Sequence, residues 1–117
     1  MSTTARSRFS DAVPASWLAA RLGIDPAKLE ALRRAGELIA VREPGSTEWR
    51  YPAWQFAGGK PRRGVARVVA AAREAGLDET SLYDLLTAPL GLRGDVRLAD
   101  LLAEGRVDEV VAAVRAS

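Results

Sequence analysis

Apolar residues recur at helical spacing in two short stretches near the start of the chain, and each stretch stops at a glycine. The first runs from about Pro14 to Leu22 and is expected to end at Gly23, because glycine tolerates the left-handed conformation that closes a helix. A short polar side chain before the first turn is the usual N-terminal cap, so Ser10 or Asp11 is predicted to cap this helix.

The second stretch opens at Asp25-Pro26, where the carboxylate can accept the free N–H groups of the first turn and proline loses no hydrogen bond. Leu29 and Leu32 then lie on one stripe, and Gly36 is expected to end the helix. Two short helices joined by a glycine-containing turn predict a helix-turn-helix.

A strand-like pattern follows the second helix. Residues 37–42 are a short strand candidate, residues 43–47 form turns readily, and residues 48–51 suit a return strand. A hairpin after a helix-turn-helix is a winged arrangement, and residues 53–56 are expected to form a turn or short helix that seals it. The side chains predicted to pack in this seal are Trp49, Tyr51, Trp54 and Phe56, against Trp17 and Leu32.

Helical patterns fill the rest of the chain beyond a stretch rich in Gly, Pro and charge. Helices are expected from Val65 to Ala75, after Asp78, around 98–102 and from Val107 to Arg115. The predicted fold class is mainly α: a winged helix-turn-helix (two short helices plus a β-hairpin) followed by a small helical domain. The predicted divisions are a mobile tail at 1–12, the winged domain at 13–56, a basic Gly/Pro linker at 57–63, and a helical interaction or dimerisation domain at 64–117.

The composition excludes several kinds of chemistry. The chain has 117 residues and contains neither His nor Cys, so it has no disulfide, thiol nucleophile, zinc-finger cluster or imidazole base. Gly58-Gly59-Lys60 lacks the spacing of a phosphate loop. The adjacent acids Asp78-Glu79 and Asp108-Glu109 sit at expected helix starts, where carboxylates favour the helix dipole. We therefore predict no catalytic residues, no metal site, no cofactor and no enzymatic activity.

The chain carries no signal for a membrane. No stretch approaches the roughly 20 apolar residues of a spanning helix, and the first ten residues lack the apolar core of a signal peptide. The strong preference for Arg over Lys is typical of a GC-rich bacterial genome. A cytoplasmic bacterial protein is expected.

Charge is distributed unevenly along the chain. Residues 1–75 hold 13 Lys or Arg and 7 Asp or Glu, whereas residues 76–117 hold 4 Arg and 8 Asp or Glu. Six of the seven aromatic residues also lie before residue 57. A basic, aromatic half and an acidic, aliphatic half indicate two tasks, one of which involves nucleic acid.

A first resemblance covers about residues 13–56. It rests on the run Trp17-Leu18-Ala19-Ala20-Arg21-Leu22-Gly23-Ile24, on the later Leu29, Leu32, Arg33, Arg34, Gly36 and Leu38, and on Trp49-Arg50-Tyr51-Pro52. This pattern resembles the winged helix-turn-helix of MerR and excisionase-like proteins. The resemblance implies that the second helix enters the major groove of double-stranded DNA and that the wing contacts the flanking backbone.

The candidate DNA-binding residues are basic or polar side chains on the expected second helix, wing and linker. They are Lys28, Arg33, Arg34, Arg42, Ser46, Thr47, Arg50, Lys60, Arg62 and Arg63. Cationic side chains in this arrangement can bind phosphates in a salt-dependent way. The alternative is that the fold is kept while these charges are merely solvated, with the linker as a solvated hinge.

A second resemblance covers the rest of the chain. Tyr51-Pro52-Ala53-Trp54-Gln55-Phe56, the run Leu82 to Leu92, Leu98-Ala99-Asp100-Leu101-Leu102 and Gly105 to Val110 resemble the helical domain of the Xre/MbcA/ParS antitoxin group. The layout is also similar to a mycobacterial winged-helix DNA-binding protein that is a kinase substrate. The antitoxin resemblance implies binding of a cognate toxin. The alternative is a helical cap or a dimerisation module.

Two apolar stripes lie in this second half, and one is expected to remain free for a partner. Their candidate interface residues are Leu98, Leu101, Leu102, Val107, Val110, Val111 and Val114. We predict a homodimer built mainly from residues 82–115; the alternative is a monomer in which both stripes fold onto the third helix. The predicted function is a DNA-binding transcriptional regulator, plausible as an antitoxin that represses its own operon. The alternative function is a protein-interaction module without sequence-specific DNA binding.

Overall fold

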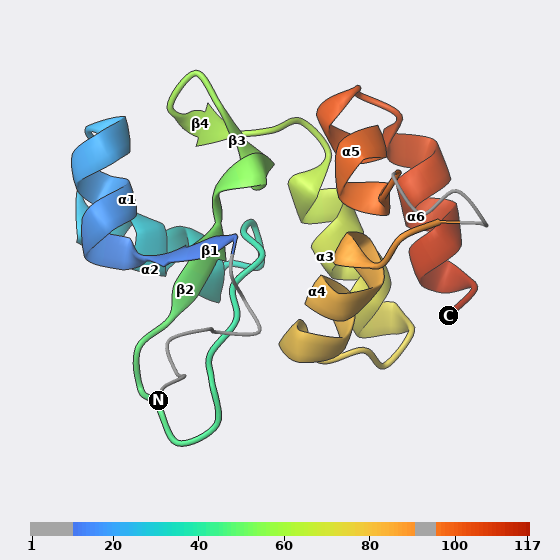
Figure 1. Ribbon diagram of the computed structural model, residues 1–117, viewed down its shortest axis with the longest axis horizontal. Coiled ribbons are helices and arrows are strands. Elements are labelled where there is room, and N and C mark those ends of the chain that lie inside the picture. The colour runs from blue at the N-terminus through green and yellow to red at the C-terminus, as the bar shows by residue number, and fades with distance from the viewer. Residues whose placement is uncertain (1–10, 91–95) are drawn as a thin grey trace.

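The computed structural model describes residues 11–90 and 96–117, which form two lobes side by side (Figure 1). The winged lobe, residues 11–61, contains β1 (Ala12–Pro14), α1 (Ala15–Leu22), α2 (Pro26–Arg34), β2 (Arg50–Pro52), the 3-10 turn η2 (Ala53–Gln55), β3 (Phe56–Ala57) and β4 (Lys60–Pro61). The helical lobe, residues 65–117, contains α3 (Val65–Glu74), α4 (Glu79–Thr87), α5 (Leu98–Ala103) and α6 (Val107–Arg115). The mainly α fold class is confirmed.

The two helices of the helix-turn-helix begin and end close to where the sequence predicts. Gly23 closes α1 in the left-handed conformation, with φ of 70°. The Asp25 carboxylate caps α2 by accepting the N–H of Ala27 at 2.9 Å. The predicted cap of α1 was wrong, because Pro14 is its N-cap residue and no side chain bonds there. Asp11 binds elsewhere, and Ser10 lies outside the described residues.

The strand pairing of the wing differs from the predicted hairpin. β2 pairs antiparallel with β1, in the register Ala12↔Pro52 and Pro14↔Arg50, instead of with residues 37–42. From that segment, only Val41 makes a bridge, to Arg50. Ala12 is therefore a strand residue, with 3% of its surface exposed. This differs from the prediction that a mobile tail extends to residue 12.

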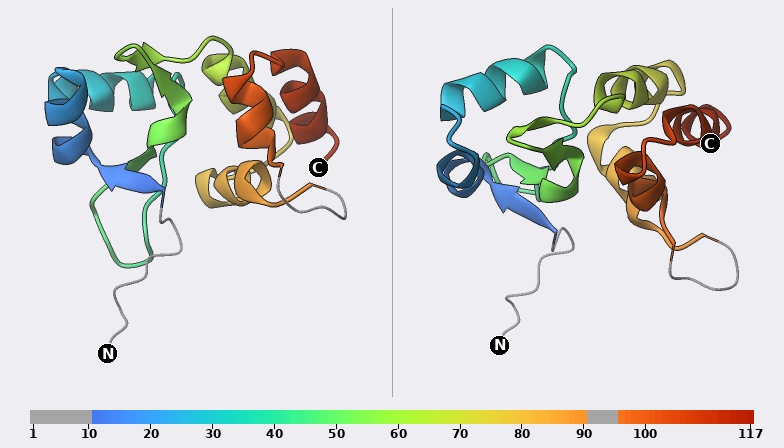
Figure 2. Two further views of the ribbon diagram at one scale, coloured as in Figure 1. Left: turned by 45° about the horizontal axis from the view of Figure 1, so that its top comes forward. Right: turned by 90° about the horizontal axis from the view of Figure 1, so that it is seen from above.

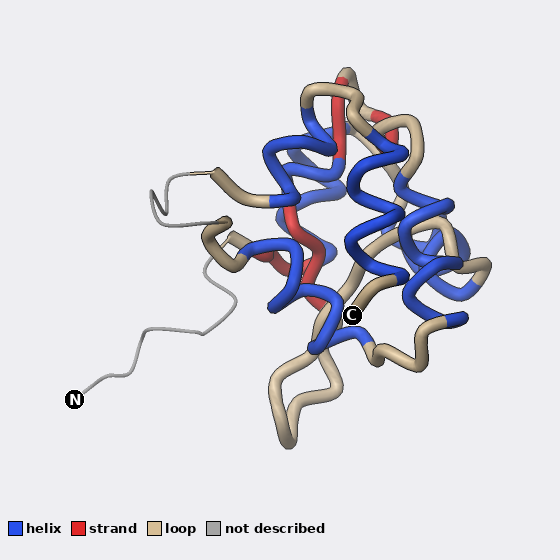
Figure 3. Tube along the Cα trace, turned by 90° about the vertical axis from the view of Figure 1, so that its right-hand side faces the viewer, coloured by secondary structure: helices blue, strands red, loops and turns tan. Residues whose placement is uncertain are grey.

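A buried glutamine explains why residues 37–42 form no regular strand. The side chain of Gln55 is fully buried, and its Oε1 accepts the backbone N–H of Ile39 at 2.7 Å. Its Nε2 donates to the carbonyl oxygen of Ile39, also at 2.7 Å. The amide side chain thus replaces a neighbouring strand at this position. The loop at 42–49 is left to project from the winged lobe, as Figure 3 shows in tan.

The aromatic seal forms with different partners from those predicted. Tyr51 and Phe56 are buried in the winged lobe with Leu18 and Leu29, while Leu32 and Trp49 pack at the edge of this cluster. Trp17 lies outside it, with 49% of its surface exposed. Trp54 packs instead against the core of the helical lobe and against a small cluster of Ala12, Val41 and Tyr83.

The apolar stripes predicted as a partner interface form the core of the helical lobe. Leu98, Leu102, Val110, Val111 and Val114 are all buried within one chain. Leu101 and Val107 are partly buried against the same cluster. Four short helices share a single core here, and α6 packs along α3 (Figure 2). Both stripes are used in folding, so these residues do not form a free interface in this structure.

Gly64 is required where α6 meets the start of α3. Its φ is 94°, and a Cβ placed on it would lie 2.5 Å from a methyl carbon of Val107. A larger residue would force the two helices apart, because such a separation is far inside van der Waals contact.

Two polar connections join the lobes. The segment expected as an open linker holds the β3–β4 hairpin, and Arg62 after it donates to the Trp54 carbonyl oxygen at 2.8 Å and to the Ala103 carbonyl oxygen at 3.3 Å. Asp11 accepts hydrogen bonds from the Tyr83 hydroxyl, from Trp54 Nε1 at 3.1 Å and from Arg97 at 3.3 Å. The lobes are therefore joined by hydrogen bonds through Arg62 and through Asp11.

Partial burial and these hydrogen bonds act oppositely on the pKa of Asp11. Burial raises it, but the hydrogen bonds from Tyr83, Trp54 and Arg97 together outweigh burial and hold it below its ordinary value of 3.8. The pKa of the Tyr83 hydroxyl is raised by its own burial and by the neighbouring carboxylate. Asp11 is thus charged and Tyr83 neutral near pH 7, which is the pairing that the hydrogen bond requires.

Candidate nucleic-acid interface

The candidate interface consists of the outward face of α2 and the 42–49 loop. On α2, five positions of this face are exposed. These positions are Ala27, Lys28, Glu30, Ala31 and Arg34. The opposite face of the helix is anchored by Leu29, which is fully buried, so the exposed face is fixed in orientation.

Trp49 links α2 to the loop by holding two arginines. The Cζ of Arg33, on α2, lies 4.3 Å from the centroid of its ring, and the Cζ of Arg42, on the loop, lies 4.6 Å from it. Both distances are within the range of a cation–π contact. Two positive charges are thus brought to one aromatic ring, although like charges repel.

Neither arginine of this stack is neutralised within the described chain. No described carboxylate lies within 4.0 Å of Arg33, Arg42 or the nearby Lys28. The Nε of Arg33 is buried and has no hydrogen-bond partner among the described residues. The arrangement is suited to an external anion, because bound phosphate supplies the negative charge that the chain does not.

Two other predicted contact residues are occupied within the winged lobe. Arg34 forms an exposed ion pair with Glu30 at 2.6 Å, which is one helical turn away. Arg50 donates to the Ala12 carbonyl oxygen at 3.3 Å and lies 3.9 Å from Glu43. We therefore assign Arg50 to holding the β1–β2 pair. Arg34 stays on the candidate surface because its ion pair is fully exposed and weak.

The tip of the loop is ordered by its own turn. The Ser46 hydroxyl accepts the N–H of Glu48 at 3.1 Å, and Thr47 between them is exposed. A groove of about 530 Å³ runs from this tip to the first turns of α1 and α2. Ser16, Ala27, Thr47 and Trp49 are among the residues that line it.

The predicted linker cations do not join this surface. Arg62 is engaged with backbone carbonyl groups, as described above. Lys60 lies on the β3–β4 hairpin, which is at the opposite end of the winged lobe from the 42–49 loop in Figure 1. Arg63 lines a separate hollow beside Arg67 and the start of α6.

Sequence reasoning missed a second aromatic–arginine pair. The Cζ of Arg21 lies 5.4 Å from the ring centroid of Trp17, one turn earlier on α1. The i, i+4 spacing of an aromatic residue and an arginine was the available signal. It was overlooked because Trp17 was assigned to the core.

The arginines of the helical lobe are mostly neutralised by carboxylates. The pairs and their N···O distances are Arg67–Asp108 at 2.9 Å, Arg97–Asp100 at 3.4 Å, Arg106–Glu109 at 2.7 Å and Arg115–Glu74 at 3.5 Å. The exposed cationic face of the molecule is therefore on the winged lobe.

No protein-family model matches the chain, and no curated protein matches it in sequence. Among solved structures, the chain is similar to the NMR structure of Rv2175c. The chain has a winged-helix fold. The superposition has a TM-score of 0.75 at 21% sequence identity, and it covers 97% of this chain and 85% of the other. In the ranges that the structure describes, no helix has the length and apolar character needed to cross a membrane.

Proposed function

We propose that this chain binds double-stranded DNA with α2 and the 42–49 loop, and that it regulates transcription by doing so. The observation that carries the proposal is the Arg33–Trp49–Arg42 stack, which places two cations between the helix and the loop with no carboxylate of the described residues within 4.0 Å. The winged-helix fold, which is similar to that of Rv2175c, supports the same assignment, because a helix-turn-helix places its second helix in the major groove. The proposed role is binding, with no catalytic step.

In the proposed complex, α2 lies in the major groove and the loop follows the adjacent backbone. Lys28 and Arg34 on α2 and Arg42 on the loop are the side chains that we assign to phosphate or base contacts. Arg33 and Arg42 are held by Trp49, so they lose little side-chain entropy when DNA binds. This prior ordering favours binding over the alternative in which the same charges are only solvated.

The experiment is a fluorescence anisotropy titration of a labelled duplex from upstream of the protein's own gene, repeated over a series of salt concentrations. The logarithm of the association constant is expected to fall linearly with the logarithm of the salt concentration, with a slope of about −0.9 per phosphate contact. The variant Lys28→Gln/Arg34→Gln/Arg42→Gln should bind at least a hundredfold more weakly and reduce the slope by about 3.

A matched control removes three charges from the helical lobe: Arg67→Gln/Arg106→Gln/Arg115→Gln. It should bind DNA within about threefold of the unsubstituted protein. Equal weakening by both triple variants would contradict the proposed face. Absence of binding to any duplex at low salt would favour the protein-interaction module.

The antitoxin role, the cognate toxin and the homodimer stay predictions. The stripes assigned to a partner by sequence are packed in the core of the helical lobe. We therefore base no part of the proposed DNA complex on a second copy of the chain.

A further inference from the structure

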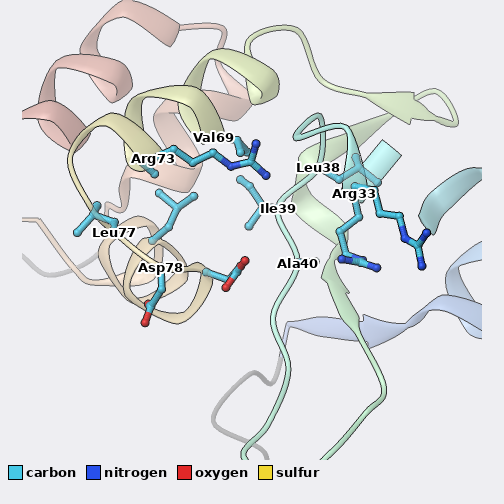
Figure 4. A pocket seen from close by; sticks show the side chains of 12 residues that line it. Arg33, Leu38, Ile39, Ala40, Val69, Arg73, Leu77 and Asp78 are labelled. Atoms are coloured by element: carbon cyan, nitrogen blue, oxygen red, sulfur yellow. The ribbon is translucent and has the colours of Figure 1, made fainter. Parts of the chain in front are cut away.

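A cavity of about 310 Å³ lies between the two lobes (Figure 4). Residues 38–40 of the winged lobe form one wall. The facing apolar surface comes from α3, α4 and the turn between them, through Val69, Ala72, Leu77 and Leu82. Water occupies about 30 Å³ per molecule in the liquid, so the space accommodates about ten groups of that size. This is the size of a small metabolite.

Arg73 supplies a positive charge to this cavity. It projects from α3 toward residues 38–39 in Figure 4, and its guanidinium lies against the backbone of Gly36. A Cβ at Gly36 would lie 2.7 Å from Arg73 Nη1, so the absence of a side chain at that position makes room for the guanidinium. Among the described arginines of the helical lobe, Arg73 alone has no described carboxylate within 4.0 Å.

Asp78 and Glu79 supply negative charge to the same cavity from the start of α4. One oxygen of Asp78 caps the helix by accepting the N–H of Ser81 at 2.8 Å, and this capping holds the pKa of Asp78 below 3.8. No ion pair joins either carboxylate to Arg73, although all three side chains line one space. The cavity thus combines separated charges of opposite sign with an apolar wall.

We propose that this cavity binds a small zwitterion with an apolar side chain, of the α-amino acid class. The carboxylate of such a ligand would pair with Arg73, its ammonium group with Glu79, and its side chain would cover Ile39, Val69 and Leu82. A ligand with a single charge is disfavoured. An anion is repelled by the carboxylates of Asp78 and Glu79, and a cation is repelled by Arg73. The side chains assigned to the ligand differ from those assigned to DNA, but the two sites adjoin, because Arg33 and the proposed DNA contact Arg34 also border the cavity.

The test titrates the full chain, without DNA, with four probes, and follows binding by calorimetry and by backbone amide chemical shifts. The probes are L-leucine, L-phenylalanine, 4-methylpentanoate and 3-methylbutylamine. The last two are leucine without its ammonium group and leucine without its carboxylate. At least one amino acid should bind, and its affinity should exceed that of both singly charged analogues at least tenfold. Shifts should concentrate at residues 38–40 and 69–82.

Variants then test each charged side. Arg73→Gln and Glu79→Gln should each weaken binding of the amino acid at least fivefold, whereas Arg115→Gln and Glu104→Gln, which remove exposed charges away from the cavity, should not change it. No binding of either amino acid at 50 mM would overturn the proposal. Equal binding of 4-methylpentanoate and leucine would also overturn it, because the acidic side would then play no part. Both results are read on the unsubstituted protein and do not depend on how the variants fold.

Discussion

The two lobes differ in what their arginines contact. In the winged lobe, Arg21, Arg33 and Arg42 lie over tryptophan rings and have no described carboxylate within 4.0 Å. In the helical lobe, Arg67 and Arg106 pair with carboxylates of α6 at 2.9 Å and 2.7 Å. An aromatic ring orders a guanidinium without cancelling its charge, whereas a carboxylate does both. The comparison therefore separates ring-stacked cations, which we keep for an external partner, from ion-paired cations used within the fold. Arg34, with its exposed pair to Glu30, is the exception.

The buried Gln55 gives the largest expected effect. Gln55→Ala removes both hydrogen bonds to Ile39, whose side chain packs in the helical lobe's core. It should lower the free energy of unfolding by about 3 kcal/mol, because a buried N–H and a buried carbonyl group lose their partners. Urea denaturation measures the change. An effect below about 1 kcal/mol would contradict the structural role of the two Gln55–Ile39 hydrogen bonds.

Substitution of Trp49 tests what its ring contributes to stability and to DNA binding. Trp49→Ala should lower the free energy of unfolding by about 1–2 kcal/mol, because the ring packs at the edge of the winged core and holds two arginines. It should also weaken DNA binding about tenfold although no charge is removed. Trp17→Ala is the matched control, since its more exposed ring holds one arginine. Unchanged DNA affinity in Trp49→Ala would contradict the ordering role of the ring.

The Asp11 cluster gives an effect that depends on pH. The pKa of Asp11 is lowered in the folded state, so its contribution to stability is complete above the unfolded value of about 3.8 and is lost as pH falls through the folded pKa. Asp11→Asn should cost about 1 kcal/mol at pH 7, and the difference from the unsubstituted protein should shrink toward pH 3. Thermal unfolding at several pH values measures this. A difference that grows on acidification would contradict the charged assignment.

The smallest effect is expected in the paired arginines. Arg106→Gln breaks an exposed ion pair with Glu109 and should change the free energy of unfolding by no more than about 0.5 kcal/mol. DNA affinity should stay within about twofold. A large loss of DNA affinity, measured by anisotropy, would place the helical lobe at the DNA and remove the contrast between the lobes.

The local features of this fold could be predicted from sequence, and the long-range ones could not. The cap at Asp25 and the stop at Gly23 depend on neighbours within a few residues, so their signals are contained in short stretches. Gln55 binds Ile39, 16 residues away, and the partners of Asp11 are 43 or more residues away. No spacing in the sequence indicates such partners. The roles of these two residues can be determined only from the folded structure.

The candidate site was predicted in part for the same reason. The exposure of Lys28 and Arg34 followed from helical period, because Leu29 fixes the buried face of α2. The stack of Arg33 and Arg42 on Trp49 joins segments that are distant in sequence, so it was missed. The prediction of an interface from the apolar stripes of α5 and α6 is wrong because a pattern gives the buried face of a helix but not what covers it.

The most direct test of the central claim is a titration of the isotope-labelled protein with a DNA duplex, followed by backbone amide chemical shifts at low and at moderate salt. We predict that the largest shifts fall on residues 26–34 and 42–49, and that they decrease as salt is raised. Shifts that concentrate on residues 65–117, or that do not respond to salt, would contradict the account.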